Sequence, residues 1–186
     1  MKTSIRNGSR RRLLGLAASS LPLLWLGGLP TRSLAGETMN SMPMSFEPLK
    51  LDDSRWRELL SPEAYRVLRR EATERAGSSP LNDEKRVGTY ICAGCFLPLF
   101  SSEHKFESGT GWPSFYQPIH PDHMQTRKDF RLIWPRTEYH CARCGGHQGH
   151  VFDDGPEPTG KRWCNNGVAL DFVPEGESLP ELRQAG

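Results

Sequence analysis

The sequence has little that would build long helices, a repeat protein or a membrane span. Its most apolar stretch, residues 13–29, is interrupted by Pro22 and by Ser and Gly residues, whereas a spanning helix needs about 20 continuous apolar residues. No segment repeats except two Cys-x-x-Cys pairs. The 186 residues include 18 Gly and 15 Pro, a content that disfavours a bundle of long helices and predicts a body rich in turns and loops.

Acidic residues are absent from the first 35 residues, although the whole chain carries 22 of them against 24 basic residues. This segment holds six basic residues, so residues 36–186 keep 18 basic and 22 acidic residues and a net charge of about −4. A mildly acidic body lacks the positive surface that attracts nucleic acid. We therefore expect no nucleic-acid partner.

The amino-terminal segment has the layout of a removable secretory signal. Residues 1–12 are polar and basic, residues 13–29 are mostly apolar, and small residues stand three and one positions before Gly36. The string SRRRLL at residues 9–14 also resembles the twin-arginine export signal. Glu37 stands where the lipidated cysteine of a lipoprotein would be. We therefore expect export by the twin-arginine route to a bacterial periplasm, with no stable membrane anchor.

The length predicts one domain with room for a short appendage. We expect a cleavable export signal at 1–35, a flexible lead-in at 36–48, a folded domain at 49–176 and a carboxy-terminal tail at 177–186.

Short helices are expected before a β-rich body. Ser61-Pro62-Glu63 offers an N-cap, a proline at the first helical position and an acid in the first turn, and an apolar face follows from Tyr65. From Val87 onward, short apolar or aromatic runs alternate with clusters of Gly, Pro, Asp and His. That spacing predicts an antiparallel β-domain with broad loops.

Four of the five cysteines form two Cys-x-x-Cys pairs that are 45 residues apart. Each pair can aim two thiolates at one ion, and two pairs complete a tetrahedral structural zinc site that would tie the ends of the β-domain together. Two disulfides, or a redox pair of the thioredoxin type, are the alternatives. The predicted ligands of a single Zn²⁺ are Cys92, Cys95, Cys141 and Cys144.

The fifth cysteine, Cys164, follows Lys161 and Arg162. Cationic neighbours favour the thiolate and make a cysteine a nucleophile. The alternative is a small buried apolar residue. An odd cysteine in an exported chain favours reactivity.

Three strings carry a resemblance to a known family: residues 109–115 (GTGWPSF), 141–156 (CARCGGHQGHVFDDGP) and 162–166 (RWCNN). They closely resemble the methionine-R-sulfoxide reductases of the B type, and the likeness runs from about residue 56 to residue 174. The resemblance implies a mainly β fold in which two antiparallel sheets form a barrel-like core, with short helices at the amino-terminal side.

The resemblance also implies a mechanism. Cys164 corresponds to the nucleophile that attacks the sulfoxide sulfur, becomes a sulfenic acid and releases methionine. A catalytic pair, His147 and His150, would supply hydrogen bonds and a proton to the departing oxygen. The other implied site residues orient the site or bind substrate: Asn166, Trp112 and Arg162. The alternative for both histidines is that they support the zinc ligands through hydrogen bonds. The alternative for Trp112 is that it is an ordinary residue of the hydrophobic core.

The chain departs from the family at Thr110, where many relatives carry a resolving cysteine. We therefore expect a thioredoxin-like dithiol to regenerate Cys164. Asn165 and Gly167 also differ from the common residues, and the other four histidines match no catalytic position. We expect a monomer that acts on oxidised proteins or peptides bearing methionine sulfoxide. The competing interpretations are an exported zinc-ribbon binding module without catalysis and a disulfide oxidoreductase.

Overall fold

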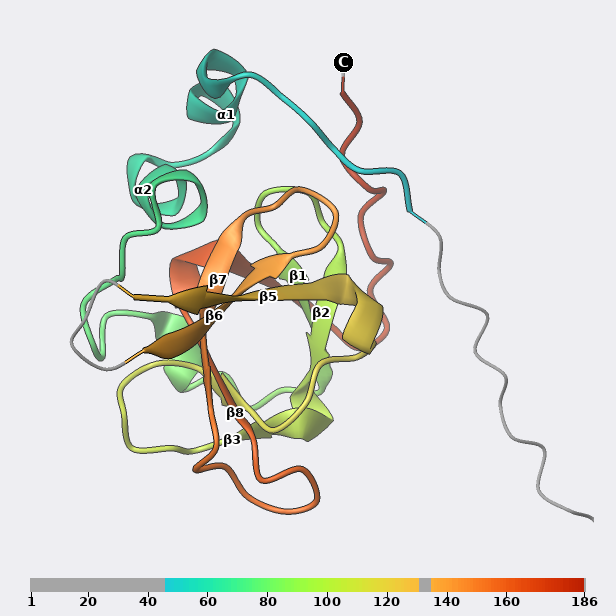
Figure 1. The fold of residues 1–186 in the computed structure, drawn as a ribbon. Helices are drawn as coiled ribbons and strands as arrows, with labels where there is room; N and C mark the ends of the chain where they lie inside the picture. The colour runs from blue at the N-terminus through green and yellow to red at the C-terminus, as the bar shows by residue number, and fades with distance from the viewer. Residues whose placement is uncertain (1–45, 131–134, 186) are drawn as a thin grey trace, which may run out of the picture. The chain divides into compact units, whose positions relative to one another are not determined.

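The computed structural model describes residues 46–130 and 135–185, all within the compact unit that spans residues 41–186 (Figure 1). The expected export signal and most of the expected lead-in lie outside the described residues. No helix in the described ranges is both long and apolar enough to cross a membrane.

Two short helices precede the strands and lie together on one side of the sheets (Figure 1). Helix α1 (Asp53–Leu59) begins after Asp52, whose carboxylate accepts a hydrogen bond from the backbone N–H of Arg55. Helix α2 (Pro62–Arg70) begins after Ser61, whose hydroxyl accepts from the backbone N–H of Ala64. Such caps satisfy backbone donors that the first helical turn leaves unpaired. The buried face of α2 packs against strand β7 and the loop that follows β8.

The strands form two antiparallel sheets, and the fold is mainly β. The three-stranded sheet has the order β2 (Pro98–Ser101), β1 (Gly88–Cys92), β9 (Leu170–Pro174). The six-stranded sheet has the order β3 (Lys105–Phe106), β4 (Ser114–Phe115), β8 (Arg162–Asn165), β7 (His147–Phe152), β6 (Arg136–Cys141), β5 (Met124–Asp129). Four 3₁₀ turns join them: η1 (Pro80–Asn82), η2 (Ser102–His104), η3 (Pro121–His123) and η4 (Gly167–Ala169).

The two antiparallel sheets agree with the predicted fold class, and no closed barrel is found in the described part of the chain. Among the described residues, β2 and β9 are the edges of one sheet and β3 and β5 are the edges of the other, so both sheets remain open. The short β3 and β4, of two residues each, offer too few backbone groups to extend the pairing around a ring.

Aromatic side chains fill the space between the two sheets. Phe100 of β2 stacks on Phe115 of β4 with ring centroids 4.1 Å apart, and Tyr90 of β1 meets Phe115 edge-on at 4.9 Å. Tyr139 of β6 joins this cluster through an edge-on contact with Phe100 at 6.2 Å. Each such pair contributes about 0.5–1.5 kcal/mol beyond the burial of its area. The core therefore fixes the six-stranded sheet, whose other face carries polar side chains.

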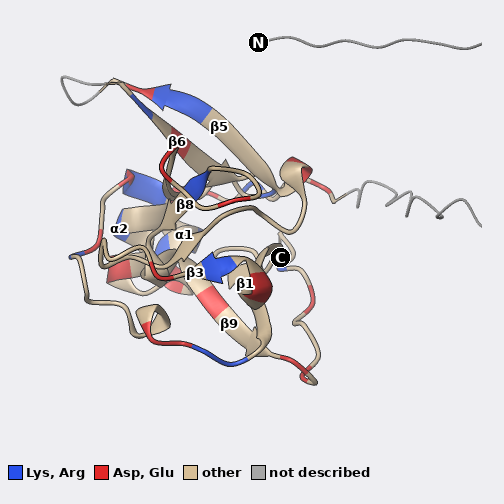
Figure 2. Cartoon of the chain, turned by 90° about the horizontal axis from the view of Figure 1, so that it is seen from below, with Lys and Arg blue, Asp and Glu red and all other residues tan. Residues whose placement is uncertain are grey.

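Charges of both signs are interleaved along the chain rather than gathered by sign (Figure 2). In this view basic segments on β5 and β8 alternate with acidic ones on the neighbouring loops and strands. A mixed distribution of this kind lacks the basic stripe that follows a nucleic-acid backbone.

Candidate active site and thiol cluster

The four paired cysteines meet in one buried cluster, as the sequence predicts. Their sulfur atoms all lie within 4.8 Å of one another. Cys92 Sγ is 3.7 Å from Cys144 Sγ, and Cys95 Sγ is 3.5 Å from Cys141 Sγ. A disulfide needs about 2.05 Å, so all four thiols are free. A tetrahedral ion bound at about 2.3 Å places its sulfur ligands about 3.8 Å apart.

The two Cys-x-x-Cys turns have the same backbone geometry. In each, the first cysteine donates its N–H to the carbonyl five residues later, at 2.9 Å in both cases. The residue after the second cysteine has a left-handed conformation, Phe96 at φ 66° and Gly145 at φ 66°. Two equivalent turns that face each other present four thiols to one point. The cluster could therefore hold a structural zinc ion and leaves no open position for substrate.

The cluster joins parts of the fold that are distant in sequence. Cys92 ends β1 and Cys141 ends β6, so an ion here would tie the two sheets together. Arg69 of α2 donates to the carbonyl of Cys144 at 2.9 Å, and Arg143 donates to the carbonyl of Cys95 at 3.2 Å. All four thiols share one site, which fits a single ion and does not present either Cys-x-x-Cys pair as a separate redox centre.

Strand register brings the fifth cysteine beside a histidine. Cys164 of β8 pairs with Ser114 of β4 on one side and with His150 of β7 on the other. Residues directly opposite on neighbouring strands point to the same face, with Cβ atoms about 5 Å apart. Cys164 and His150 therefore share the polar face of the six-stranded sheet.

These two residues line a small pocket of about 90 Å³. The pocket also includes Trp112 and Asn166, so four of the six predicted non-cluster site residues meet there. His147 is not among its lining residues. Its ring lies 5.5 Å from that of His150, and only 1% of the residue is exposed. His147 is therefore placed behind His150.

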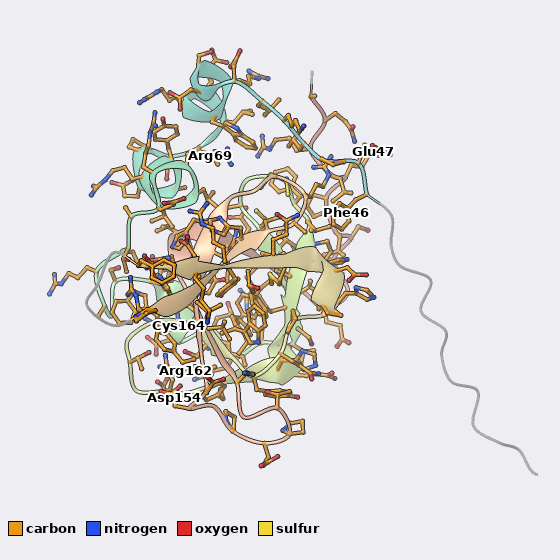
Figure 3. All side chains as sticks on the ribbon, in the orientation of Figure 1. Phe46, Glu47, Arg69, Asp154, Arg162 and Cys164 are labelled. Atoms are coloured by element: carbon orange, nitrogen blue, oxygen red, sulfur yellow. The ribbon has the colours of Figure 1, made fainter. Side chains whose placement is uncertain are left out.

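Arg162 is held two residues before Cys164 on the same strand. Its guanidinium donates two hydrogen bonds to the carboxylate of Asp154, at 2.8 and 2.9 Å. Figure 3 shows Cys164, Arg162 and Asp154 following one another along one side of the sheet. A bidentate pair fixes the direction of the guanidinium, so Arg162 acts beside Cys164 as an oriented cation.

Burial raises the pKa of Cys164 above its ordinary value. The charge and hydrogen bonding of Arg162, and hydrogen bonding from Thr110 and Ser114, lower this pKa but do not offset the burial. The resting site therefore holds Cys164 as a thiol near neutral pH. This differs from the thiolate that its cationic neighbours suggest, because sequence neighbours do not reveal burial.

Two hydroxyl groups, those of Thr110 and Ser114, form hydrogen bonds with Cys164, and Ser108 links them. Ser108 Oγ lies 2.9 Å from Thr110 Oγ1 and 2.8 Å from Ser114 Oγ. Thr110, where the family resemblance implies a resolving cysteine, therefore belongs to a hydroxyl network beside Cys164.

A buried carboxylate orients His150, and sequence reasoning did not find it. Asp129 of β5 is 5% exposed, and its Oδ2 lies 2.9 Å from His150 Nε2 and 2.7 Å from Arg136 Nη2. Burial lowers the pKa of His150, and the bond to Asp129 raises it in part. The imidazole is therefore neutral near pH 7, with its Nε2 proton directed at Asp129. No local motif marks Asp129, since only the sheet register brings it to β7.

A second unpredicted residue, Glu74, braces the pocket from the loop after α2. Its carboxylate accepts hydrogen bonds from the backbone N–H groups of Gly167 at 2.6 Å and Val168 at 3.0 Å. Its own backbone N–H donates to Asn166 Oδ1 at 2.9 Å, and its carbonyl accepts from Trp112 Nε1 at 3.2 Å. Glu74 therefore holds two of the predicted site residues in place.

A half-buried free cysteine that shares a pocket with a histidine and a tryptophan is typical of a thiol-dependent enzyme. This protein combines such a site with a separate four-thiol cluster on a β-fold. Residues 60–174 match the family model described as the SelR domain, and the chain belongs to this family.

Several relatives are similar over most of the chain. The chain is 48% identical over 134 residues to the peptide methionine sulfoxide reductase MsrB of Methanosarcina barkeri, a match that covers 72% of this chain and 94% of the relative. It is 48% identical over 132 residues to the MsrB of Leptospira interrogans, covering 71% and 100%. It is 54% identical over 119 residues to the MsrB of Pseudomonas putida, covering 64% and 90%.

Proposed function

We propose that this protein reduces the R epimer of methionine sulfoxide, in oxidised proteins and peptides, to methionine. The proposal depends on the pocket that Cys164 shares with His150 and Trp112, in a chain whose relatives are named peptide methionine sulfoxide reductases. A volume of about 90 Å³ fits the end of one side chain rather than a whole peptide. The substrate then enters as a single oxidised side chain, with the methyl group against Trp112.

The reaction transfers one oxygen atom and two electrons. Cys164 Sγ attacks the sulfoxide sulfur while the thiol proton passes to the sulfoxide oxygen. The new Sγ–S bond and the S–O bond of the substrate then break as the oxygen, with its proton, becomes bonded to Sγ. Methionine leaves with its sulfur reduced, and Cys164 remains as a sulfenic acid. His150, oriented by Asp129, carries the proton between the two groups.

Regeneration uses an external dithiol of the thioredoxin class. One thiol of this partner attacks the sulfenic acid, so that water leaves and a mixed disulfide with Cys164 forms. The second thiol of the partner attacks that disulfide, which releases the Cys164 thiol and the oxidised partner. The other four cysteines of the chain bind a structural zinc ion in this proposal, and Thr110 offers no resolving thiol.

The enzyme is exported as a folded monomer by the twin-arginine route. The basis for this part is the string at residues 9–14, together with a thiol cluster that needs its metal before it meets an oxidising compartment. Changing Arg10 and Arg11 to Lys should leave the precursor in the cytoplasm, measured by cell fractionation. Normal export of that variant would indicate the general secretory route.

The central test is turnover of the two separated sulfoxide epimers by residues 36–186. We expect reduction of the R epimer alone, no activity in Cys164→Ser, and strongly reduced activity in His150→Gln. His120→Gln, which changes a histidine outside the pocket, is the matched control and should keep full activity. Equal rates on both epimers, or an active Cys164→Ser variant with its zinc in place, would contradict the proposal.

A further inference from the structure

A second group of metal-ligating side chains lies on the polar face of the six-stranded sheet. Glu138 and His140 of β6 and His147 of β7 place one ligand atom each within 4.8 Å of the others. The register shift between Tyr139 and His140 pairs His140 with His147, which brings all three to the same face. The exposed fractions are 4%, 7% and 1%. They are separate from the four-thiol cluster, and neither the family resemblance nor the proposed reaction uses Glu138 or His140.

The distances fit a tetrahedral ion. His147 Nδ1 is 3.2 Å from Glu138 Oε2, and His140 Nε2 is 3.6 Å from the same oxygen. Nitrogen and oxygen ligands bind Zn²⁺ at about 2.0–2.2 Å, so two ligand atoms of one tetrahedron lie about 3.3–3.5 Å apart. Both measured separations are close to this value. Two imidazoles and a carboxylate also form a ligand set that zinc enzymes use while leaving a fourth position open.

The orientation of His140 favours the binding of a cation. Its Nδ1 lies 3.3 Å from the carbonyl oxygen of Gly145, which can only accept a hydrogen bond. The ring proton therefore sits on Nδ1, and the lone pair of Nε2 faces Glu138 Oε2. Within the described ranges, this buried Nε2 has no hydrogen-bond partner. A second ring nitrogen anchored on a carbonyl is the usual support of a metal-binding histidine.

One carboxylate oxygen of Glu138 is left for a cation. Arg127 of β5 forms ion pairs with Oε1 of Glu138 and with Glu71, so one guanidinium is shared between two carboxylates. Oε2 of Glu138 is directed at the two imidazoles rather than at Arg127. A buried carboxylate oxygen that faces two imidazoles is a suitable ligand for a metal ion.

We propose that Glu138, His140 and His147 form a second site for a divalent transition-metal ion such as Zn²⁺, and that its occupation inhibits the enzyme. Imidazole nitrogen is a preferred ligand of zinc, copper and nickel ions. A metal ion on His147 places positive charge beside His150, whose ring lies 5.5 Å from that of His147, and so opposes the protonation of His150 that the proposed reaction needs. The binding part stands on the geometry alone, whereas the inhibition part rests on the proposed reductase function.

The binding test uses the protein with its four-thiol cluster already loaded with zinc. After loosely held metal is removed with EDTA, Co²⁺ is added and bound metal is counted by equilibrium dialysis. We expect one additional ion per chain, with d–d absorption of a tetrahedral nitrogen and oxygen site and without sulfur charge-transfer bands. His140→Phe should bind no additional ion. His104→Phe, a half-buried histidine elsewhere, is the matched control and should bind one.

A second variant keeps the test decisive if His140→Phe does not fold. Glu138→Gln retains the shape of the side chain and removes its charge, and should weaken Co²⁺ binding by about tenfold or more. Absence of the additional ion in the native sequence would overturn the proposal. Equal binding by the native protein and a folded His140→Phe or Glu138→Gln variant would also overturn it.

The inhibition test measures a single turnover of methionine sulfoxide without added thiol, because thiol reductants bind zinc. Excess Zn²⁺ should slow sulfenic acid formation in the native protein, and EDTA should restore it. His140→Phe should react at the native rate with or without Zn²⁺. Equal inhibition of this variant would place the zinc on Cys164 and refute the inhibition part. If no turnover occurs under any condition, the reductase function fails while the binding result still decides the site.

Discussion

Replacing Glu74 with Ala should destabilise the protein and disable the pocket together. The substitution removes the acceptor of the Gly167 and Val168 backbone N–H groups, at 2.6 and 3.0 Å, in a partly buried turn. A hydrogen bond to a charged group contributes about 1.5–3 kcal/mol, and partial access of water to the turn reduces the loss. We therefore expect the free energy of unfolding to fall by about 2–4 kcal/mol, measured by urea denaturation of the zinc-loaded protein.

The catalytic consequence follows from the backbone of the same residue. Its N–H binds Asn166 Oδ1 and its carbonyl binds Trp112 Nε1, so loss of the side-chain anchor releases both pocket walls. We expect kcat/KM to fall by about tenfold or more, since misplacing a substrate by an ångström costs up to a hundredfold. Glu74→Gln keeps one acceptor oxygen and should show a smaller loss in both measurements.

The matched control is Glu58→Ala, which removes an exposed partner of Arg55 on α1. Exposed pairs contribute about 0.2–1 kcal/mol, so this variant should keep nearly native stability and full activity. If Glu74→Ala loses no more stability than Glu58→Ala, or retains native kcat/KM, the bracing role of Glu74 is wrong.

Three further predictions concern the cysteines. Because burial raises the pKa of Cys164, the single-turnover rate should increase as pH rises above neutral. Arg162→Gln should move this pH profile to higher pH, because the charge of Arg162 lowers that pKa, whereas Lys161→Gln should leave the profile unchanged. An unmoved profile in Arg162→Gln would contradict the role of its charge. Cys95→Ala should abolish zinc binding and lower the free energy of unfolding strongly, since structural zinc contributes on the order of 10 kcal/mol in small domains. A metal-free Cys95→Ala variant with native circular dichroism and a native urea midpoint would refute a structural role of the zinc ion. Thr110→Cys should form a disulfide with Cys164 after one turnover, because Thr110 lies within hydrogen-bonding distance of Cys164; the disulfide is detected as loss of both thiols. A persistent sulfenic acid would show that the loop cannot bring the two sulfur atoms together.

Local sequence signals predict those parts of the fold that local geometry determines. The four-cysteine cluster is confirmed, because a Cys-x-x-Cys turn fixes two thiols without reference to the rest of the chain. The ion inside it remains a prediction. The mainly antiparallel β-architecture in two sheets is also confirmed, since turn residues separate short apolar runs. The barrel-like arrangement that the family resemblance implies stays a prediction, and no closed barrel is found among the described residues; closure depends on strand tilt and register, which local sequence signals do not specify.

The residues that hold the candidate site in place, Asp129 and Glu74, are far in sequence from the residues they contact, so the sequence does not predict their roles. Asp129 and His150 lie on strands that do not neighbour each other, with β6 between them. Glu74 reaches Asn166 across 92 positions of sequence. In the sequence both acids resemble ordinary surface charges. Nothing near Asp129 shows that the sheet buries it, and nothing near Glu74 shows that it accepts hydrogen bonds from the backbone of η4. Finding these two acids would require knowledge of the strand order and pairing register, which no sequence motif supplies.

The bulge between β6 and β7 explains how one sheet serves both core and chemistry. Tyr139 and Cys141 of β6 are fully buried, where Tyr139 contacts the aromatic core and Cys141 joins the thiol cluster. Alternation along the strand then sends Glu138 and His140 to the opposite face. The register shift at His140 sets this residue against His147 instead of the following Gln148. Strand β6 thus places Cys141 of the thiol cluster on one side and Glu138 and His140 on the other, opposite His147 of β7. Occupation of the imidazole group by a metal would therefore reach the active site without disturbing the core.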